Sequence, residues 1–245
     1  MSILNLTAEN RNGQTVITHS SFTAPLKIAQ PFYRDGYTEV MMMAAAAGIL
    51  EGDFYDISLT VRKGAALKFT EQSYTKIFKS GKKGSSRRIR ITVESGGRLH
   101  YLPTPTIPFA GSAFCDSTEI HLESGSKFIM TDILSAGRIA MNERFAFKSY
   151  RTRTAVYSDE RLCFLDNRRL VPSECDLAGI GFFEGYSHCG MMYIFGENIG
   201  DKLPKSGGAE AAMTKAKEGI CIRAFGSAGE DIAELFADVI RGIKQ

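Results

Sequence analysis

The chain has 245 residues, of which 44% are hydrophobic and 23% are charged, an ordinary balance for a globular protein. Its 30 basic and 27 acidic residues leave a net charge of +3, which argues against a dedicated nucleic-acid-binding protein, because such domains are usually strongly basic. The N-terminus has no basic segment and is polar by Thr7, unlike a signal peptide. With five scattered cysteines, these features predict a cytoplasmic protein with reduced thiols.

The longest apolar run is VMMMAAAAGIL, residues Val40–Leu50. It has about half the length of a membrane-spanning helix, which needs about twenty residues. We therefore predict that it is buried in the core and that the chain does not enter a membrane.

A weak rhythm follows along the chain. The segments VRKGAALKF (61–69), VESGGRLHY (93–101) and LESGSKFIM (122–130) each place a glycine in a strand-like context. Because glycine accepts positive φ, each segment is predicted to be a hairpin of strand, turn and strand around Gly64, Gly96 or Gly125. The recurrence at about thirty residues suggests stacked β layers.

The stretches IRITV and TEIHL between these turns alternate apolar with polar residues, as expected for strands with one face in the core. Three prolines, Pro103, Pro105 and Pro108, predict an extended edge or crossing segment in YLPTPTIPF. We find no linker, so we predict a single domain over residues 1–245.

Helix signals occur near the C-terminus. Ser227 and Glu230 have the spacing of a capping box. An apolar stripe with helical spacing follows, formed by Ile232, Leu235, Phe236, Val239 and Ile240. AEAAMTKAK (209–217) is a second, shorter helix candidate. The predicted fold is thus mainly β, a β-helical stack of sheet layers with about two α-helices towards the C-terminus.

Motifs for metal binding or catalysis are absent from the sequence. The chain has no HxxxH, HxH, CxxC, GxSxG or nucleotide-binding loop. His188 and Cys189 are neighbours, but adjacent residues of a strand point to opposite faces. The basic run KSGKKGSSRRIR (79–90) is either a solvated loop or a contact for an acidic partner protein.

The stretch TDILSAGRIAMNERF (131–145) concentrates charge around a Gly-Arg pair. If Arg138 is buried, it requires a carboxylate partner. Asp132, Glu143 and Asp166 are the candidates, and we expect an internal ion pair between Arg138 and Asp132. The stretch is either a structural ion-pair network or part of a polar channel through the core.

Taken together, several motifs resemble the urease accessory protein family UreD, also called UreH. They are GILEGD (Gly48, Gly52, Asp53), TEQSYTKIFKS (with Thr70, Thr75 and Lys76), LHYLPTPTIPFAGSAF (with Pro103, Pro108 and Phe109) and GRIAMNERF (with Gly137, Arg138 and Glu143). The sequence departs from the family pattern at Glu71, Phe78 and Asn142, and MAAAAG replaces a His-Pro-Pro-Gly element. Asn142 is still expected to accept a turn with positive φ.

The resemblance implies a non-catalytic scaffold that binds UreF and, through UreF, the GTPase UreG, in a complex that is a dimer of heterotrimers. The complex docks on the urease structural subunits and helps nickel delivery. No cofactor is tightly bound, and nickel passes transiently at most. The matching positions that would line or frame an internal nickel path are Asp53, Thr70, Lys76, Asp132, Arg138 and Asp166. The C-terminal helix is expected either to contribute to UreF binding or to pack only on its own sheet.

A rival interpretation is a β-helical carbohydrate-active enzyme with Asp132 and Glu143 as paired carboxylates at about 5–9 Å. A third is a structural protein that binds other partners through its basic run.

Overall fold

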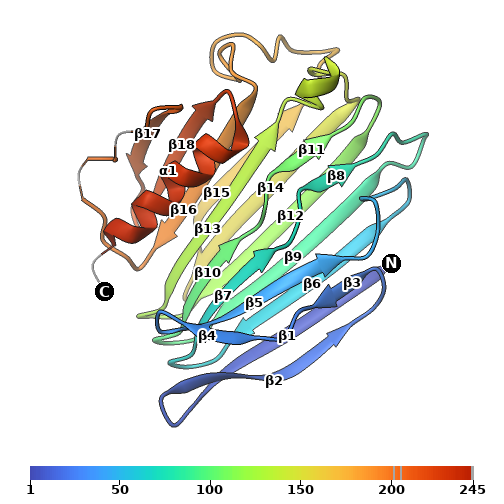
Figure 1. Cartoon of the computed structure of the whole chain (residues 1–245). Coiled ribbons are helices and arrows are strands. Elements are labelled where there is room, and N and C mark those ends of the chain that lie inside the picture. The colour runs from blue at the N-terminus through green and yellow to red at the C-terminus, as the bar shows by residue number, and fades with distance from the viewer. Residues whose placement is uncertain (201, 205, 244–245) are drawn as a thin grey trace.

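The computed structural model describes residues 1–245 except 201, 205 and 244–245. Two large sheets lie face to face, and a helix covers part of the outer face of one of them (Figure 1). In the first sheet the strands follow in the order β15 (Arg161–Leu170), β14 (Ser149–Ser158), β12 (Ala113–Leu122), β9 (Ser85–Val93), β6 (Phe54–Val61), β1 (Ser2–Arg11) and β2 (Gln14–Phe22).

The second sheet follows the order β17 (Ala209–Lys215), β18 (Gly219–Gly226), β16 (His188–Phe195), β13 (Lys127–Ser135), β10 (Arg98–Leu102), β7 (Ala66–Glu71), β5 (Tyr37–Ala44) and β3 (Leu26–Ile28). The short strands β4 (Phe32–Arg34), β8 (Thr75–Ile77) and β11 (Thr106–Pro108) pair beside this path. Central strands of both sheets run parallel, whereas outer strands such as β2, β15, β16 and β18 are antiparallel to their neighbours.

The stack of β layers is confirmed, but the predicted hairpins are wrong. The turns at Gly64, Gly96 and Gly125 have φ of +66°, +67° and +74°. They connect a strand of the first sheet to a strand of the second, as in β6 to β7, β9 to β10 and β12 to β13. Each strand therefore pairs with the equivalent strand about thirty residues away, as in a solenoid. Successive turns are joined by backbone hydrogen bonds, such as Arg98 N to Ala65 O at 2.8 Å.

The expectation of two helices is corrected to one α-helix among the described residues, α1 (Gly229–Gly242). The segment predicted as a helix over 209–217 contains the edge strand β17, which pairs with β18. Here backbone pairing with an available sheet edge overrides the helix preference of an alanine-rich segment. A single 3₁₀ turn, η1 (Ile139–Met141), ends at Asn142, whose φ of 57° confirms the expected left-handed turn.

The helix packs as its apolar stripe predicts. Ile232, Leu235, Phe236 and Val239 are buried against the outer face of the second sheet. Gly190 on β16 permits this approach, because a Cβ there would lie 2.4 Å from a methyl of Ile232. The predicted capping box is wrong, since the N-cap is Ala228 and no side chain caps the helix.

Other expectations are met only in part. Val40, Met42 and Ile49 are buried, whereas the alanines at 44–47 are exposed, at the end of β5 and in the loop that follows it. The basic run is also split: its lysines lie on an exposed turn, but Arg87 and Arg88 belong to β9.

The proline-rich segment is extended, with β11 paired to β8 and β13. Within the described residues, no helix is long and apolar enough to cross a membrane.

We predict that Phe236→Ala lowers the free energy of unfolding by about 3–5 kcal/mol, because it opens a cavity between α1 and the sheet. Urea denaturation followed by circular dichroism measures this change. Glu234→Ala, on the exposed side of the same helix, is the control and should change the stability by less than about 0.5 kcal/mol. Equal midpoints for both variants would contradict the packing of α1.

Candidate functional site

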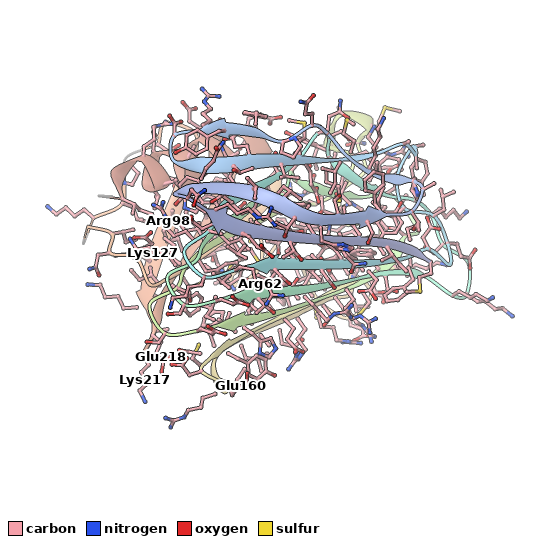
Figure 2. The ribbon with its side chains drawn as sticks, turned by 90° about the horizontal axis from the view of Figure 1, so that it is seen from below. Arg62, Arg98, Lys127, Glu160, Lys217 and Glu218 are labelled. Atoms are coloured by element: carbon pink, nitrogen blue, oxygen red, sulfur yellow. The ribbon has the colours of Figure 1, made fainter. Side chains whose placement is uncertain are left out.

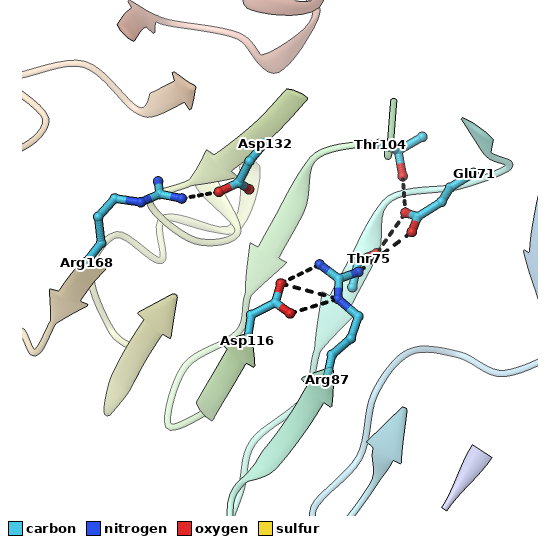
Figure 3. A network of polar contacts seen from close by, with 7 residues as sticks. All are labelled: Glu71, Thr75, Arg87, Thr104, Asp116, Asp132 and Arg168. Carbon is cyan, nitrogen blue, oxygen red and sulfur yellow. Dashed lines mark hydrogen bonds and ion pairs between the residues drawn. The ribbon is translucent and has the colours of Figure 1, made fainter. Parts of the chain in front are cut away.

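A buried arginine lies between the two sheets. Arg87 shares its parity on β9 with Ile89 and Ile91, so its side chain points inward with theirs. Its Nη2 donates to Asp116 Oδ2 at 2.7 Å, and its Nη1 lies 3.6 Å from Glu71 Oε1 (Figure 3). Asp116 is the partner of Arg87 in the register of β12 and β9. The side chains of all three residues are at least nine-tenths buried.

Glu71 reaches this cluster from the second sheet, at the end of β7. Its Oε2 accepts hydrogen bonds from the hydroxyls of Thr75 at 3.2 Å and Thr104 at 3.3 Å. Burial raises the pKa of the Glu71 carboxyl, although Arg87 and the two hydroxyls act in the opposite direction. Glu71 Oε1 has no hydrogen-bond partner, so this carboxylate keeps an unused acceptor.

A second buried arginine, Arg168 on β15, lies farther along the same interior. It forms an ion pair with Asp132 of β13, and its Nε lies 3.2 Å from Asp166 Oδ2. The hydroxyl of Tyr193 donates to Asp166 Oδ2 at 2.6 Å. Burial alone would lower the pKa of Arg168, but Asp132, Tyr193 and Asp166 keep it well above the usual value. Both arginines are therefore charged and held by carboxylates.

The strand register places these groups at one level across the first sheet. Arg87 pairs with Asp116, Asp116 with Thr152, and Thr152 with Arg168. We call the inward polar side chains at this level the polar row: Glu71, Arg87, Asp116, Thr152, Asp132, Asp166 and Arg168.

Cavities follow the polar row from one side of the molecule to the other. A cavity of about 140 Å³ is lined by Glu71, Arg87 and Lys76. A space of about 10 Å³, lined by Arg87 and Asp132 among others, lies next along the row, and it matches the volume of about one water. A third cavity of about 290 Å³ reaches Arg168. Arg87 lines the first two spaces, and the Asp132–Arg168 pair lies between the second and the third.

The structure brings together two of the six residues expected to frame a path. Asp132 and Asp166 both contact Arg168. The expected pair of Asp132 with Arg138 is wrong. Arg138 instead binds Glu143, with Nε to Oε2 at 2.8 Å, and its guanidinium lies 4.3 Å from the centre of the Phe109 ring. Because Arg138 is about one-third exposed, it needs no buried partner.

The other expected path residues lie apart from the polar row or at its margin. Asp53 accepts a hydrogen bond from the Leu50 N–H at 2.8 Å and so fixes a turn. Thr70 points to the outer side of the second sheet and lines a groove beside α1. Lys76 is exposed at the mouth of the first cavity.

The motif glycines and prolines have local structural roles. A Cβ at Gly48 would lie 2.4 Å from the Lys76 carbonyl oxygen, and one at Gly137 would lie 2.5 Å from that of Glu143. Gly52, with φ of +80°, forms the turn that Asp53 fixes. The remaining motif residues are Pro103, which lines the smallest cavity, Pro108, which ends β11, and Phe109, which packs on Phe78 at 4.8 Å.

Sequence reasoning missed Glu71, Arg87, Asp116 and Arg168. A signal was present for three of them, because each lies an even number of residues from a buried apolar residue of its strand. The pairs are Glu71 with Phe69, Arg87 with Ile89, and Asp116 with Ile120. A charge in phase with core residues indicates a buried ionic group.

The chemistry of the polar row is that of oxygen donors and guanidinium groups. Within the described part of the chain, no three His, Cys, Asp or Glu side chains are grouped to hold a metal ion. Asp132 and Glu143, the pair proposed for glycoside hydrolysis, are each engaged by a different arginine. The structure therefore does not bring these two carboxylates together at one arginine.

We predict that Arg87→Ala lowers the free energy of unfolding by about 3–5 kcal/mol, because it leaves two buried carboxylates without their cation. Arg88→Ala is the control: Arg88 is the next residue of β9, points outward and pairs with Asp56 at 2.6 Å. It should cost less than about 1 kcal/mol. Urea denaturation of both variants measures the difference, and similar losses in the two would exclude a buried charge at Arg87.

Comparison with known proteins gives a consistent family. The family model described as UreD urease accessory protein matches residues 2–245. The chain is 43% identical over 204 residues to "Urease accessory protein UreD" of Acetivibrio thermocellus, covering 82% of this chain and 78% of that protein. It is 31% identical over 243 residues to "Urease accessory protein UreH" of Helicobacter hepaticus, covering 97% and 96%. It is 30% identical over 241 residues to a UreH of Helicobacter pylori, covering 96% and 91%. With its solenoid of β layers, the chain belongs to the UreD family of urease accessory proteins.

Proposed function

We propose that the protein is a non-catalytic scaffold in urease maturation that binds UreF and, through UreF, the GTPase UreG. In this proposal the complex docks on apo-urease, and this chain helps to deliver nickel through its interior. Family membership and the names of the relatives support the accessory role. The observation that supports the internal route is the polar row, whose side chains line three separate cavities.

The ligand chemistry of the polar row suits passage. A strong site of several imidazoles or thiolates would retain nickel, whereas isolated carboxylates and hydroxyls bind it weakly. Among the described residues, no grouping of metal ligands interrupts the route. The small space between Arg87 and Asp132 would require these side chains to move as an ion passes, so this segment is the expected constriction.

The charge of the polar row also favours a cation. Fully ionised, its four carboxylates outweigh its two guanidinium groups and leave a net charge of −2. Burial raises the pKa of Glu71, so the empty row holds this charge only when Glu71 is deprotonated. A divalent cation near Glu71 would favour its ionised form. Entry of a cation would therefore act on the Glu71 pKa in the direction opposite to burial.

UreF binding is assigned to the surface beside α1. The apolar stripe of α1 is already buried on its own sheet and cannot serve a partner. A groove of about 360 Å³ remains between α1 and the segment around Leu102–Pro105, lined mainly by apolar side chains. Tyr74 donates a hydrogen bond to Glu230 across this groove, and this contact fixes the position of the start of the helix.

We predict that Asp132→Asn reduces urease activation about tenfold, equivalent to about 1.4 kcal/mol in the barrier to passage, while the complex with UreF and UreG still forms. Urease activity after co-expression of the complete gene set measures activation, and size-exclusion chromatography measures complex formation. Glu119→Gln is the matched control, because Glu119 lies on the outer face of β12 beside His121. Undiminished activation with soluble Asp132→Asn would refute the internal route.

We also predict that Ala233→Arg, at the exposed edge of the groove beside α1, abolishes co-elution with UreF, because a guanidinium would fill the apolar groove. Glu234→Arg, one residue farther along the helix and outside the groove, is the control. Co-elution of UreF with Ala233→Arg would place the UreF surface elsewhere and leave the test with Asp132 unaffected.

A further inference from the structure

A cavity larger than the three along the polar row lies outside it. It is a cleft of about 560 Å³ on the outer face of the second sheet, beside the last turn of α1. We call it the outer cleft. Its floor is formed by outward side chains of the sheet, among them Tyr37, Lys68, Arg98, His100 and Lys127, and α1 contributes Ile240 to its wall. Cavities of this size hold small organic ligands in many proteins.

The floor of the outer cleft is a built polar network. Lys68 forms an ion pair with Glu39, its register partner on β5. Lys127 forms an ion pair with Glu197 at 3.1 Å, and the Glu197 side chain is 8% exposed. The carboxylates of Glu39 and Glu197 thus accept from lysines. They are less available to bind a cationic ligand.

Arg98 is a cation of the outer cleft that takes part in neither of these ion pairs. Its guanidinium lies 5.1 Å from the centre of the Tyr37 ring, and no carboxylate among the described residues forms an ion pair with it. Arg98 is the register partner of Lys127, and Figure 2 shows the two side chains at the same end of the molecule. A guanidinium with free N–H groups beside an ammonium is suited to an oxyanion.

His100 adds a neutral donor to the floor. The imidazole Nε2 lies 3.2 Å from the Tyr37 hydroxyl. Burial, with Lys68 and Arg98 nearby, lowers the pKa of His100 to about 4, so the ring is neutral at pH 7. Burial raises the pKa of Tyr37, so its hydroxyl keeps the proton and forms a neutral hydrogen bond with Nε2. A neutral imidazole carries one N–H donor in either tautomer.

We propose that the outer cleft binds a small organic anion, whose carboxylate or phosphate group contacts Arg98 and whose apolar part lies against Leu102, Ile240 and Ile243. The five cationic and three carboxylate side chains that line the cleft leave a net charge of +2, which favours an anion. The apolar side chains of α1 give the ligand a hydrophobic contact that inorganic phosphate lacks. This site faces away from the polar row and does not depend on the nickel route.

Isothermal titration calorimetry of the full chain tests the proposal with benzoate, phenyl phosphate and inorganic phosphate as probes, and with benzamide as the uncharged control. We expect saturable binding of benzoate, phenyl phosphate or both, weaker binding of inorganic phosphate, and none of benzamide. A preference between the first two identifies the oxyanion as carboxylate or phosphate.

Arg98→Gln should weaken binding of the bound probe at least about tenfold, the loss expected when a charge-assisted hydrogen bond is removed. Arg62→Gln is the matched control, because Arg62 is an exposed arginine outside the cleft that pairs with Glu94 at 2.5 Å. A thermal melt of each variant verifies folding, and Arg98→Lys should retain part of the affinity if Arg98→Gln is unstable. Absence of saturable binding with all three anions, or equal affinity in Arg98→Gln and the wild type, would overturn the proposal.

Discussion

The ion pair of Arg87 with Asp116, with Glu71 opposite it, is the constraint on which the interior depends. Two sheets packed face to face exclude water, so a charge between them must be balanced within hydrogen-bonding distance. Arg87 comes from the first sheet and Glu71 from the second. The cluster therefore fixes the level of the two sheets relative to each other as well as the register of β9 and β12.

This constraint acts on specificity more than on stability. A buried ion pair contributes little relative to apolar side chains of similar volume, because desolvation offsets its attraction. A slip of β9 by one residue, however, would turn Arg87 outward together with Ile89 and Ile91. It would bring Arg88 and Arg90 inward, so two arginines would replace one arginine and apolar side chains between the sheets. The polar row thus helps to select one stacking of the β layers.

The sequence predicts strands well where apolar and polar residues alternate clearly. It predicts the connections between strands less well. IRITV and TEIHL are strands, as the alternation indicates. The glycines 64, 96 and 125 do mark turns with positive φ, but the same local chemistry serves a hairpin and an arc between two sheets. Only the pairing of strands about thirty residues apart distinguishes them, and that pairing depends on contacts far along the chain.

The sequence predicts that an arginine pairs with a carboxylate, but it does not predict which carboxylate. Arg138 binds its near neighbour Glu143 and not the expected Asp132, whereas the arginine that binds Asp132 is Arg168, from another strand. The antiparallel return of β15 next to β14 brings Arg168 to the interior, and this pairing cannot be read from the local sequence. Edge strand β17 illustrates the same limit, since its alanines form a strand by pairing with the free edge that β18 would otherwise present.

Strand alternation separates the two candidate surfaces of the second sheet. On β7, Glu71 points into the polar row while Lys68 lies in the outer cleft. On β10, Tyr101 points inward and His100 outward, and on β13 Asp132 points inward while Ile133 packs under α1. Neighbouring residues of one strand thus lie on opposite faces of the sheet, in different environments. Side chains of one parity therefore form the ionic interior, while those of the other parity form an outer face with both cations and carboxylates on the same strands.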